Sequence, residues 1–444
     1  MLFRRIVAHL AISALLGGAV GLAQADDRDD HRSSRWITAW ATSQQPNVIP
    51  ATISNATVRM IARVKADGDM VRIRLDNSFG TSPVLIGRAS VGARVQAALV
   101  ANGSSRQLFF GGSAAVTLPP GGSVMSDPVA MRVWAQEDLA VSLYVPSSSV
   151  SPSMHQGAVV TSYRTADGSG DSSAVELATP FTQTTTQMWW LKSVDVHSDN
   201  TTGTVVAFGD SITDGTCTTL DANNRWEDIV SMRLDIGDND SRAVFGAAPV
   251  IRAQGLRRGG TASLAPYKSI INEGIGGNTI TRANLSPRPD STPGIERLDR
   301  DVLSHTGVTH VVLFMGTNDI RREASVTAVI AGMQNIIQRV RARGLKIIGV
   351  TIIPRHNVAP LGTNTGWSPA KTAIRNQVND WIRHSGAFDA VLDFDAVVRD
   401  PANFDLLYPA FNCGDGIHPS PTGYYQMGKA VNLEVFGRSG RDND

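Results

Sequence analysis

The sequence predicts two domains of different fold class, an all-β domain followed by an α/β domain with a parallel sheet. Its 444 residues are too many for one ordinary hydrophobic core. Short alternating strands fill the first half, whereas apolar strands and amphipathic helices alternate in the second half. We expect a β-sandwich or jelly-roll-like domain over residues 36–196, a linker over residues 197–203 and the α/β domain over residues 204–440.

The N-terminus has the organisation of an export signal. Two arginines precede an apolar run over residues 6–22, which ends in the small residues Ala23-Gln24-Ala25. This order predicts a secretory signal peptide over residues 1–25, cleaved after Ala25. An uncleaved membrane anchor is the alternative, which His9 and the glycines of the run disfavour. We therefore expect a secreted or periplasmic protein with no membrane span after cleavage and a disordered, charged N-terminus over residues 26–35.

Composition excludes several kinds of partner. The formal net charge is +1 and charged residues make up 18% of the chain, so nothing in the charge favours nucleic acid or an acidic membrane surface. The sequence has no P-loop, no internal repeat and no basic cluster interleaved with aromatic residues. No obligate protein partner is implied.

Alternation with period two supports the all-β domain. Val71, Ile73 and Leu75 alternate with polar residues, which predicts a half-buried strand. The run over residues 139–145 ends at Pro146 in the same way. Clusters of Gly, Pro, Asp and Ser separate these runs, and no helical period is present.

The rhythm changes after residue 203. An apolar strand begins at Val205, and a helix is expected from about Asn224. Ser325 is placed to cap a long amphipathic helix that ends at Gly344. Short, predominantly apolar strands over residues 311–315, 347–353 and 390–394 lie between the helices and predict a parallel sheet covered on both faces. Residues 237–264 are expected to form a surface insertion.

A serine lies at the end of the first of these strands. The segment Gly209-Asp210-Ser211 follows the apolar residues 205–208, and such a tight turn can present a nucleophile. Asp210 occupies the variable position of the G-x-S-x-G elbow. The segment is nevertheless not that elbow, because Thr213 stands where the final glycine would be. A helix N-cap is the alternative interpretation of this serine. In a parallel sheet the carboxyl ends of the strands are where ligands bind.

Three further segments carry candidate functional residues. The glycine-rich segment 272–278 can expose backbone N–H groups to an anion, although tight turns alone would account for its glycines. The segment 316–319, Gly-Thr-Asn-Asp, follows an apolar strand and could be only a helix cap. Asp415 and His418 are spaced so that one turn can bring carboxylate and imidazole together, with Pro419 stiffening it. A loop histidine beside an Asx-turn is the alternative.

The two cysteines flank these segments. Cys217 follows Ser211 closely, and Cys413 precedes Asp415. In an exported chain this placement predicts a Cys217–Cys413 disulfide that ties the two segments together. Two buried, reduced thiols are the alternative.

Taken together, these segments resemble the GDSL or SGNH hydrolase family. Its four blocks occur in order as Gly-Asp-Ser at 209–211, an N-x-G-x-x-G type turn at 272–277, G-x-N-D at 316–319 and D-x-x-H-P at 415–419. Residues 38–41 and 75–80 also resemble the N-terminal β-domain of a bacterial secreted subgroup. The long segment between the first two blocks departs from the compact members of the family.

The resemblance implies a flavodoxin-like αβα fold and ester hydrolysis by a catalytic triad. Ser211 would be the nucleophile, His418 the general base and Asp415 the group that orients the imidazole. The oxyanion hole would consist of the backbone N–H groups of Ser211 and Gly277 and the side-chain amide of Asn318. Spacing alone does not distinguish Gly277 from Gly276. Asp210 and Asp319 are interpreted as structural.

The expected activity is hydrolysis of short acyl esters, with acetyl groups on a polysaccharide as one substrate class. Lipase, lysophospholipase or arylesterase activity is the alternative, and a carbohydrate-binding protein without catalysis is an alternative of another class. Tryptophans of the β-domain could face solvent and bind sugar, or pack in its core; these are Trp36, Trp40, Trp134, Trp189 and Trp190. No metal-ligand cluster is recognisable, so neither a metal nor another cofactor is expected.

Overall fold

The structure is a computed structural model, and Ser34–Asp444 form one compact unit. It describes residues 35–46, 51–237, 267–282, 285–286, 291–355 and 367–437. The predicted signal peptide, residues 26–34 and nearly all of the predicted insertion therefore lie outside the described residues. Within the described ranges, no helix is both long enough and apolar enough to cross a membrane.

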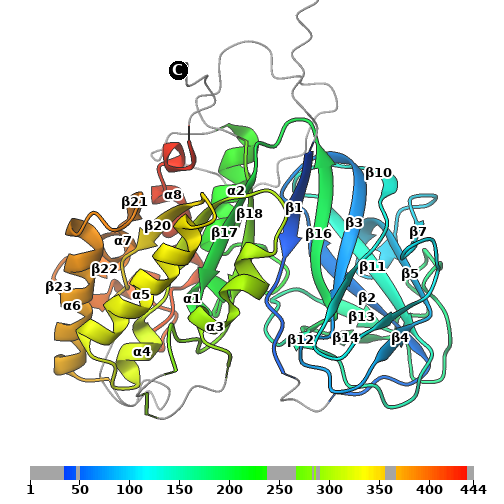
Figure 1. The fold of residues 1–444 in the computed structure, drawn as a ribbon, viewed down its shortest axis with the longest axis horizontal. Helices are drawn as coiled ribbons and strands as arrows, with labels where there is room; N and C mark the ends of the chain where they lie inside the picture. Colours follow the sequence, from blue (N-terminus) through cyan, green and yellow to red (C-terminus); the bar gives the residue numbers. More distant parts are fainter. Residues whose placement is uncertain are drawn as a thin grey trace, which may run out of the picture. The chain divides into compact units, whose positions relative to one another are not determined.

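Two antiparallel sheets form the N-terminal β-sandwich (Figure 1). One has the order β1 (Arg35–Ala41), β16 (Leu191–Ser198), β3 (Gly68–Asp76), β10 (Val129–Val133), with β9 (Ser123–Met125) beside β3. The other has the order β14 (Gln183–Thr185), β13 (Ser162–Arg164), β2 (Ala56–Arg63), β11 (Asp138–Val145), β5 (Arg88–Gln96), β6 (Leu99–Val100), with β7 (Arg106–Leu108) beside β5. Two short pairs complete it: β4 (Val84–Ile86) with β8 (Val116–Leu118), and β12 (Met154–His155) with β15 (Met188–Trp189).

One hydrophobic core joins the two sheets. Val71, Ile73 and Leu75 of β3 are fully buried, and they pack in the same cluster as Val58 of β2 and Val141 of β11. The alternating residues of β3 are half-buried, as period two requires when one face of a strand is in the core. Packing of two inner faces on one core is the defining feature of a sandwich.

The segment between the two domains is shorter than expected. β1 begins at Arg35, and β16 continues to Ser198, so only residues 199–203 connect β16 to the next strand. His197 and Ser198 are polar yet belong to the strand because they pair with Trp36 and Arg35 of β1. Partner strands thus extend the element beyond the point where its own sequence turns polar.

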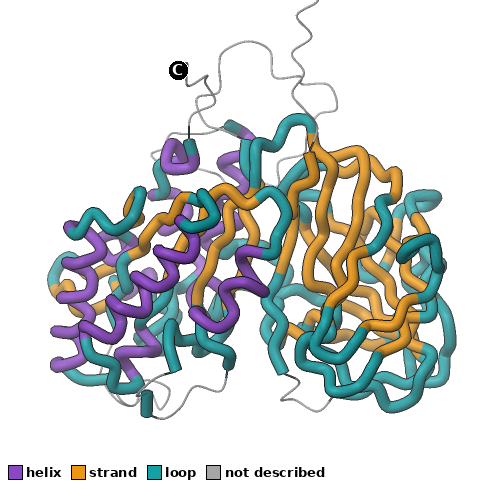
Figure 2. Tube along the Cα trace, viewed as in Figure 1, coloured by secondary structure: helices purple, strands orange, loops and turns teal. Residues whose placement is uncertain are grey.

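The second half contains a five-stranded parallel sheet with helices on both faces, as the sequence predicts (Figure 2). Its strand order is β18 (Ser269–Gly274), β17 (Thr204–Gly209), β19 (Val308–Phe314), β20 (Lys346–Val350), β21 (Ala390–Leu392). This 2-1-3-4-5 order is that of flavodoxin-like folds, so the expected fold class is confirmed.

Alternation along β17 distributes its side chains between two cores. Val206 and Phe208 pack with the helices of one face, which are α3 (Gly294–Leu298), the π-helix η1 (Asp299–Leu303), α5 (Val326–Arg341) and α6 (Pro369–His384). Val205 and Ala207 pack with those of the other face, which are α2 (Trp226–Ile236), α7 (Phe394–Val398) and α8 (Pro421–Ala430). A central strand buried on both faces has to be largely apolar, and residues 205–208 of this strand are.

Capping residues explain where the helices begin. Ser325 accepts a hydrogen bond from the N–H of Ala328 and starts α5 as expected, although the helix ends at Arg341, before Gly344. Short elements lie at the ends of the sheet: α1 (Ser211–Asp214), α4 (Thr317–Arg321), η3 (Pro409–Phe411), η4 (Leu433–Phe436), and the strand pair β22 (Arg399–Asp400) with β23 (Asn403–Leu407).

Candidate active site

Ser211 is the first residue of α1, directly beyond the carboxyl end of β17. Asp210 caps this helix, because its Oδ1 accepts the N–H of Ile212 at 3.0 Å. Burial raises the pKa of Asp210 to about 6. Asp210 therefore shapes the turn that presents the Ser211 hydroxyl, in agreement with its interpretation as a structural residue.

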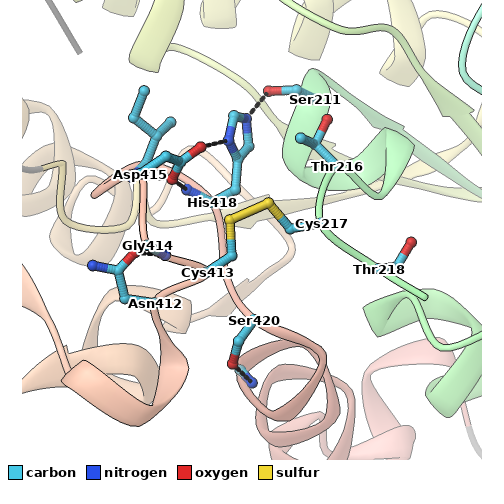
Figure 3. The surroundings of a disulfide bond; sticks show 12 residues. Ser211, Thr216, Cys217, Thr218, Asn412, Cys413, Gly414, Asp415, His418 and Ser420 are labelled. Atoms are coloured by element: carbon cyan, nitrogen blue, oxygen red, sulfur yellow. Dashed lines mark hydrogen bonds and ion pairs between the residues drawn. A yellow bond between two sulfur atoms is a disulfide. The ribbon is translucent and has the colours of Figure 1, made fainter. Parts of the chain in front are cut away.

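Asp415 and His418 lie in one tight turn. Oδ1 of Asp415 accepts the backbone N–H groups of Ile417 and His418 at 2.8 and 2.9 Å, and its Oδ2 lies 2.5 Å from Nδ1 of the imidazole. The other ring nitrogen, Nε2, lies 2.8 Å from Oγ of Ser211, across 207 positions of sequence (Figure 3). The structure thus brings hydroxyl, imidazole and carboxylate into one hydrogen-bonded chain.

The carboxylate determines which imidazole nitrogen carries the proton. Burial alone would raise the pKa of Asp415, but hydrogen bonds from the side chain and backbone of His418 hold it at about 2. An ionised carboxylate can only accept, so Nδ1–H of His418 donates to it. Nε2 is then free to accept the hydroxyl proton of Ser211, which is the arrangement a general base requires.

A Cys217–Cys413 disulfide joins the two segments, as expected from the sequence (Figure 3). It lies next to Asp415, and these three side chains are the one group of His, Cys, Asp or Glu in the described ranges that is close enough to share a metal ion. The sulfurs are bonded to each other and Asp415 already accepts from His418. This group therefore does not have the character of a thiolate metal site.

The three predicted oxyanion donors come from three separate elements. The N–H of Ser211 is at the start of α1, Gly277 follows β18, and Asn318 is in α4. Among the described residues, no acceptor contacts the N–H of Ser211 or of Gly277. Nδ2 of Asn318 donates one hydrogen to the carbonyl of Asn278 at 3.0 Å, which orients the amide and leaves its second hydrogen for another acceptor.

The structure distinguishes the two glycines that spacing could not. The N–H of Gly276 donates to Oδ2 of Asp214 at 3.0 Å. Gly277 has a φ of +70°, and no atom of the described residues lies within 4 Å of where its Cβ would be. A glycine suits this position because it adopts positive φ without strain. The N–H of Gly277, rather than that of Gly276, is therefore available to a ligand.

Asp319, in the segment 316–319, holds the backbone that follows the glycine-rich segment 272–278. Its buried carboxylate accepts the N–H groups of Ile280 and Thr281, at 2.9 and 3.1 Å. Burial raises the pKa of Asp319 to about 7. Within the described ranges its hydrogen bonds are with backbone N–H groups, which fits the structural role that the sequence suggested.

Sequence reasoning missed two buried side chains behind the turns. Arg297 of α3 donates to the carbonyl of Gly209 at 2.9 Å, to that of Glu273 at 2.9 Å and to Oδ1 of Asn278 at 3.0 Å. His155 of the β-sandwich lies 2.8 Å from Oδ1 of Asp214. Neither residue has a local motif, and the only signal was Asp214, an acidic residue three positions after Ser211.

The fold and this hydrogen-bonded chain define an α/β domain of hydrolase type, in which a serine beyond the first strand meets a histidine and an aspartate from a C-terminal turn. Residues 207–426 match the GDSL-like Lipase/Acylhydrolase family, and through them the chain belongs to that family. The predicted likeness of residues 38–41 and 75–80 to a bacterial subgroup stays a prediction, because the match begins at residue 207. No curated protein matches the chain.

Several solved structures are similar to half of the chain. A carbohydrate acetylesterase from Sinorhizobium meliloti is 17% identical with a TM-score of 0.38, over 52% of this chain and 98% of the other. An aryl esterase from M. smegmatis is 19% identical with a TM-score of 0.36, and the match covers 52% of this chain and 98% of the esterase. A GDSL-like lipase from Bacteroides thetaiotaomicron VPI-5482 is 15% identical with a TM-score of 0.34, over 52% and 87%.

Proposed function

We propose that this protein is an exported serine esterase that hydrolyses short acyl esters. The observation that carries the proposal is the chain of hydrogen bonds from Ser211 through His418 to Asp415, 2.8 and 2.5 Å long. It lies beyond the carboxyl end of β17, where open parallel sheets bind ligands. Membership of an acylhydrolase family agrees with this chemistry.

The first half of the reaction acylates the enzyme. Oγ of Ser211 attacks the acyl carbon while Nε2 of His418 takes the hydroxyl proton, and the carbonyl oxygen becomes an oxyanion. Asp415 stabilises the imidazolium that forms. When the tetrahedral intermediate collapses, the bond to the leaving oxygen breaks and the alkoxide takes the proton from His418. Water then attacks the acyl-enzyme by the same route and regenerates the Ser211 hydroxyl.

The oxyanion would be stabilised by the N–H groups of Ser211 and Gly277 and the amide of Asn318. These donors are held in place before substrate arrives, Asn318 by its bond to the carbonyl of Asn278. Donors organised in advance stabilise developing charge without reorganisation, and removing one costs about 3–4 kcal/mol of transition-state stabilisation.

Polysaccharide acetyl groups are the substrate class that we favour. Trp134 supports this choice, because 49% of its surface is exposed and Arg132 stacks on it at 4.3 Å. Trp189 and Trp190 instead pack in the core of the sandwich. An exposed, rigid aromatic face is a common means of contacting a sugar ring. Lipase, lysophospholipase and arylesterase activities are the alternatives.

Export is part of the proposal. It rests on the signal-like segment over residues 1–25 and on the Cys217–Cys413 disulfide, since disulfides persist in oxidising compartments. The mass of the mature N-terminus in the secreted fraction tests it. A protein that begins after Ala25 supports export, and one that retains residue 1 and stays in the cytoplasm contradicts it.

Covalent labelling tests the nucleophile. An organophosphonate should label wild-type protein at Ser211, and Ser211→Ala should lose both labelling and esterase activity, the latter by at least about a thousandfold. Ser231→Ala is a matched control, because Ser231 is a buried serine of α2 that accepts a hydrogen bond from Gln136. Folded wild-type protein that remains unlabelled would leave only a binding function.

A substrate panel tests the specificity. It would compare acetylated sugars, aryl esters and phospholipids, and then acyl esters of increasing chain length. We expect activity to fall steeply beyond short acyl chains and to be highest on acetylated sugars. Highest activity on phospholipids or long acyl chains would favour the lipase alternatives.

A further inference from the structure

A histidine of the β-sandwich reaches the turn that carries Ser211. His155 lies in β12 and is 2% exposed. Its Nδ1 is 2.9 Å from the backbone carbonyl of Ser43, and its Nε2 is 2.8 Å from Oδ1 of Asp214. Asp214 is the last residue of α1, the helix that Ser211 begins. One contact thus links the sandwich to the four-residue helix of the candidate site.

Both nitrogens of His155 face oxygen atoms, and this determines where its protons lie. The carbonyl of Ser43 can only accept, so Nδ1 carries a hydrogen. Between Nε2 and Asp214 there must be one more proton. Burial lowers the pKa of His155, but the charge of Asp214 and its hydrogen bond outweigh burial and raise it. The two short contacts therefore hold the imidazole between the carbonyl of Ser43 and the carboxyl group of Asp214.

Other charged groups lie close to this pair. Arg225 donates from Nε to the backbone carbonyl of Asp214 at 2.7 Å, and its charge disfavours the imidazolium. Arg63 of β2 and Asp138 of β11 line the same small cavity as His155 and Asp214. Arg63 binds Asp138 at 2.7 Å, so its guanidinium is paired outside the contact between His155 and Asp214. Asp214 therefore receives donors from two domains.

The second oxygen of Asp214 holds the glycine turn. Oδ2 accepts the N–H of Gly276 at 3.0 Å. The backbones are also close together, since a Cβ on Gly274 would lie 2.2 Å from the nitrogen of Asp214. Gly277 follows with its positive φ, and its carbonyl accepts from Nη1 of Arg322 at 3.5 Å. The hydrogen bond between Gly276 and Asp214 thus helps to set the position of the Gly277 N–H, together with the backbone bond from Asn278 to Ile275.

We propose that His155 is a positioning residue for the oxyanion hole: it fixes the carboxylate of Asp214, which in turn fixes the Gly276–Gly277 turn. The proposal rests on the proposed esterase function, in which the N–H of Gly277 binds the oxyanion. It makes the β-sandwich a structural part of the active site and not only an appended module. A donor displaced by about an ångström loses most of its effect on the transition state.

Kinetics of three variants test this proposal. Concentrations are first corrected by the end-point stoichiometry of phosphonate labelling, so that unfolded protein does not count. His155→Leu removes both hydrogen bonds and should lower kcat about tenfold to a hundredfold, with KM changed less than about threefold. His155→Gln can place an amide N–H toward Asp214 and should retain kcat within about fivefold of wild type.

His197→Leu is the matched control. His197 is also a histidine of the sandwich that contacts an aspartate, Asp69 at 3.1 Å, but it lies at the surface on β16. It should leave kcat and KM unchanged. If His155→Leu cannot be purified, Asp214→Ala and Asp214→Asn make the same comparison, because only asparagine keeps an acceptor for Gly276 and a partner for His155.

Hydrogen exchange gives a readout that does not depend on catalysis. Amides in residues 272–280 should exchange faster in His155→Leu than in wild type or His197→Leu. Slower turnover together with faster exchange supports the proposal. Unchanged turnover per labelled site, or unchanged exchange in this segment, overturns it. Wild-type protein without activity or labelling at Ser211 would instead show that the proposed function itself is wrong.

Discussion

Asp319 is a buried acid whose protonation affects stability. Its carboxyl group is fully buried and burial raises its pKa to about 7, whereas an aspartate in an unfolded chain ionises near pH 4. Between about pH 4 and about pH 7 the folded protein holds a proton that the unfolded chain has released. The free energy of unfolding therefore falls as pH rises across this window, and the loss is complete above about pH 7.

Asp319→Asn should remove this pH dependence. Asparagine does not ionise, and its oxygen can still accept from Ile280 and Thr281. We expect the variant to gain up to about 3 kcal/mol relative to wild type between about pH 5 and about pH 8, measured by urea unfolding. Asp299→Asn, at an exposed aspartate of η1, is the control. Parallel pH curves for Asp319→Asn and wild type would contradict the prediction.

At the scale of elements, two sets of contacts hold the turn that carries His418. The disulfide fixes it to the segment after α1. Local hydrogen bonds stabilise the turn internally. The N–H of Cys413 donates to the carbonyl of His418 at 3.0 Å, and Oδ1 of Asn412 accepts the N–H groups of Gly414 and Gly416. The disulfide closes a chain loop of sequence separation 196, whereas the hydrogen bonds act within a few residues.

Removing the disulfide should therefore affect stability more than turnover. Replacing Cys217 and Cys413 together by serine frees the unfolded chain and should lower the free energy of unfolding by at most roughly 5 kcal/mol. Turnover should fall less than about tenfold, because the local hydrogen bonds of the turn remain. Thermal unfolding and kinetics on the double variant measure both effects. A loss of turnover without a loss of stability would show that the disulfide acts mainly on the site.

Local signals explain how far the sequence predicted these elements. The strand at Val205 and the cap at Ser325 depend on neighbouring residues only, so their positions could be read directly. Asp415 and His418 were recognisable for the same reason. His155 and Arg297 act over distances of 59 and 88 positions from their partners Asp214 and Gly209, and no periodicity or spacing encodes such contacts. The end of β16 was misplaced because pairing with β1 extends it.

At the scale of the whole molecule, buried charges connect the β-sandwich to the hydrolase domain. Lys65 pairs with Asp228, and Lys192 of β16 lies 2.8 Å from Asp301 of η1. Both members of the second pair are at most 1% exposed. Burial lowers the pKa of Lys192, but Asp301 and other nearby carboxylates raise it further, so the ammonium stays charged. A charge buried in this way is tolerated only while its partner remains in place.

The pair predicts that the two domains unfold together. Lys192→Met removes one charge and leaves Asp301 with Arg297 and Arg300, at 3.3 and 2.7 Å. Because these arginines remain, we expect a loss of about 3 kcal/mol in the free energy of unfolding, near the lower limit for breaking a buried pair. Since the pair spans both domains, the variant should still unfold in one transition, shifted to lower urea, when followed by fluorescence and by circular dichroism.

Lys346→Met is the comparison that isolates the effect of burial. Lys346 also pairs with an aspartate, Asp389 at 3.5 Å, but 65% of its side chain is exposed. An exposed pair contributes at most about 1 kcal/mol, so this variant should unfold close to wild type. Equal losses for the two lysines would show that the contact between Lys192 and Asp301 is not specifically stabilising. Two separate transitions in Lys192→Met would show that the β-sandwich folds independently, and the mutual dependence inferred from the buried charges would be wrong.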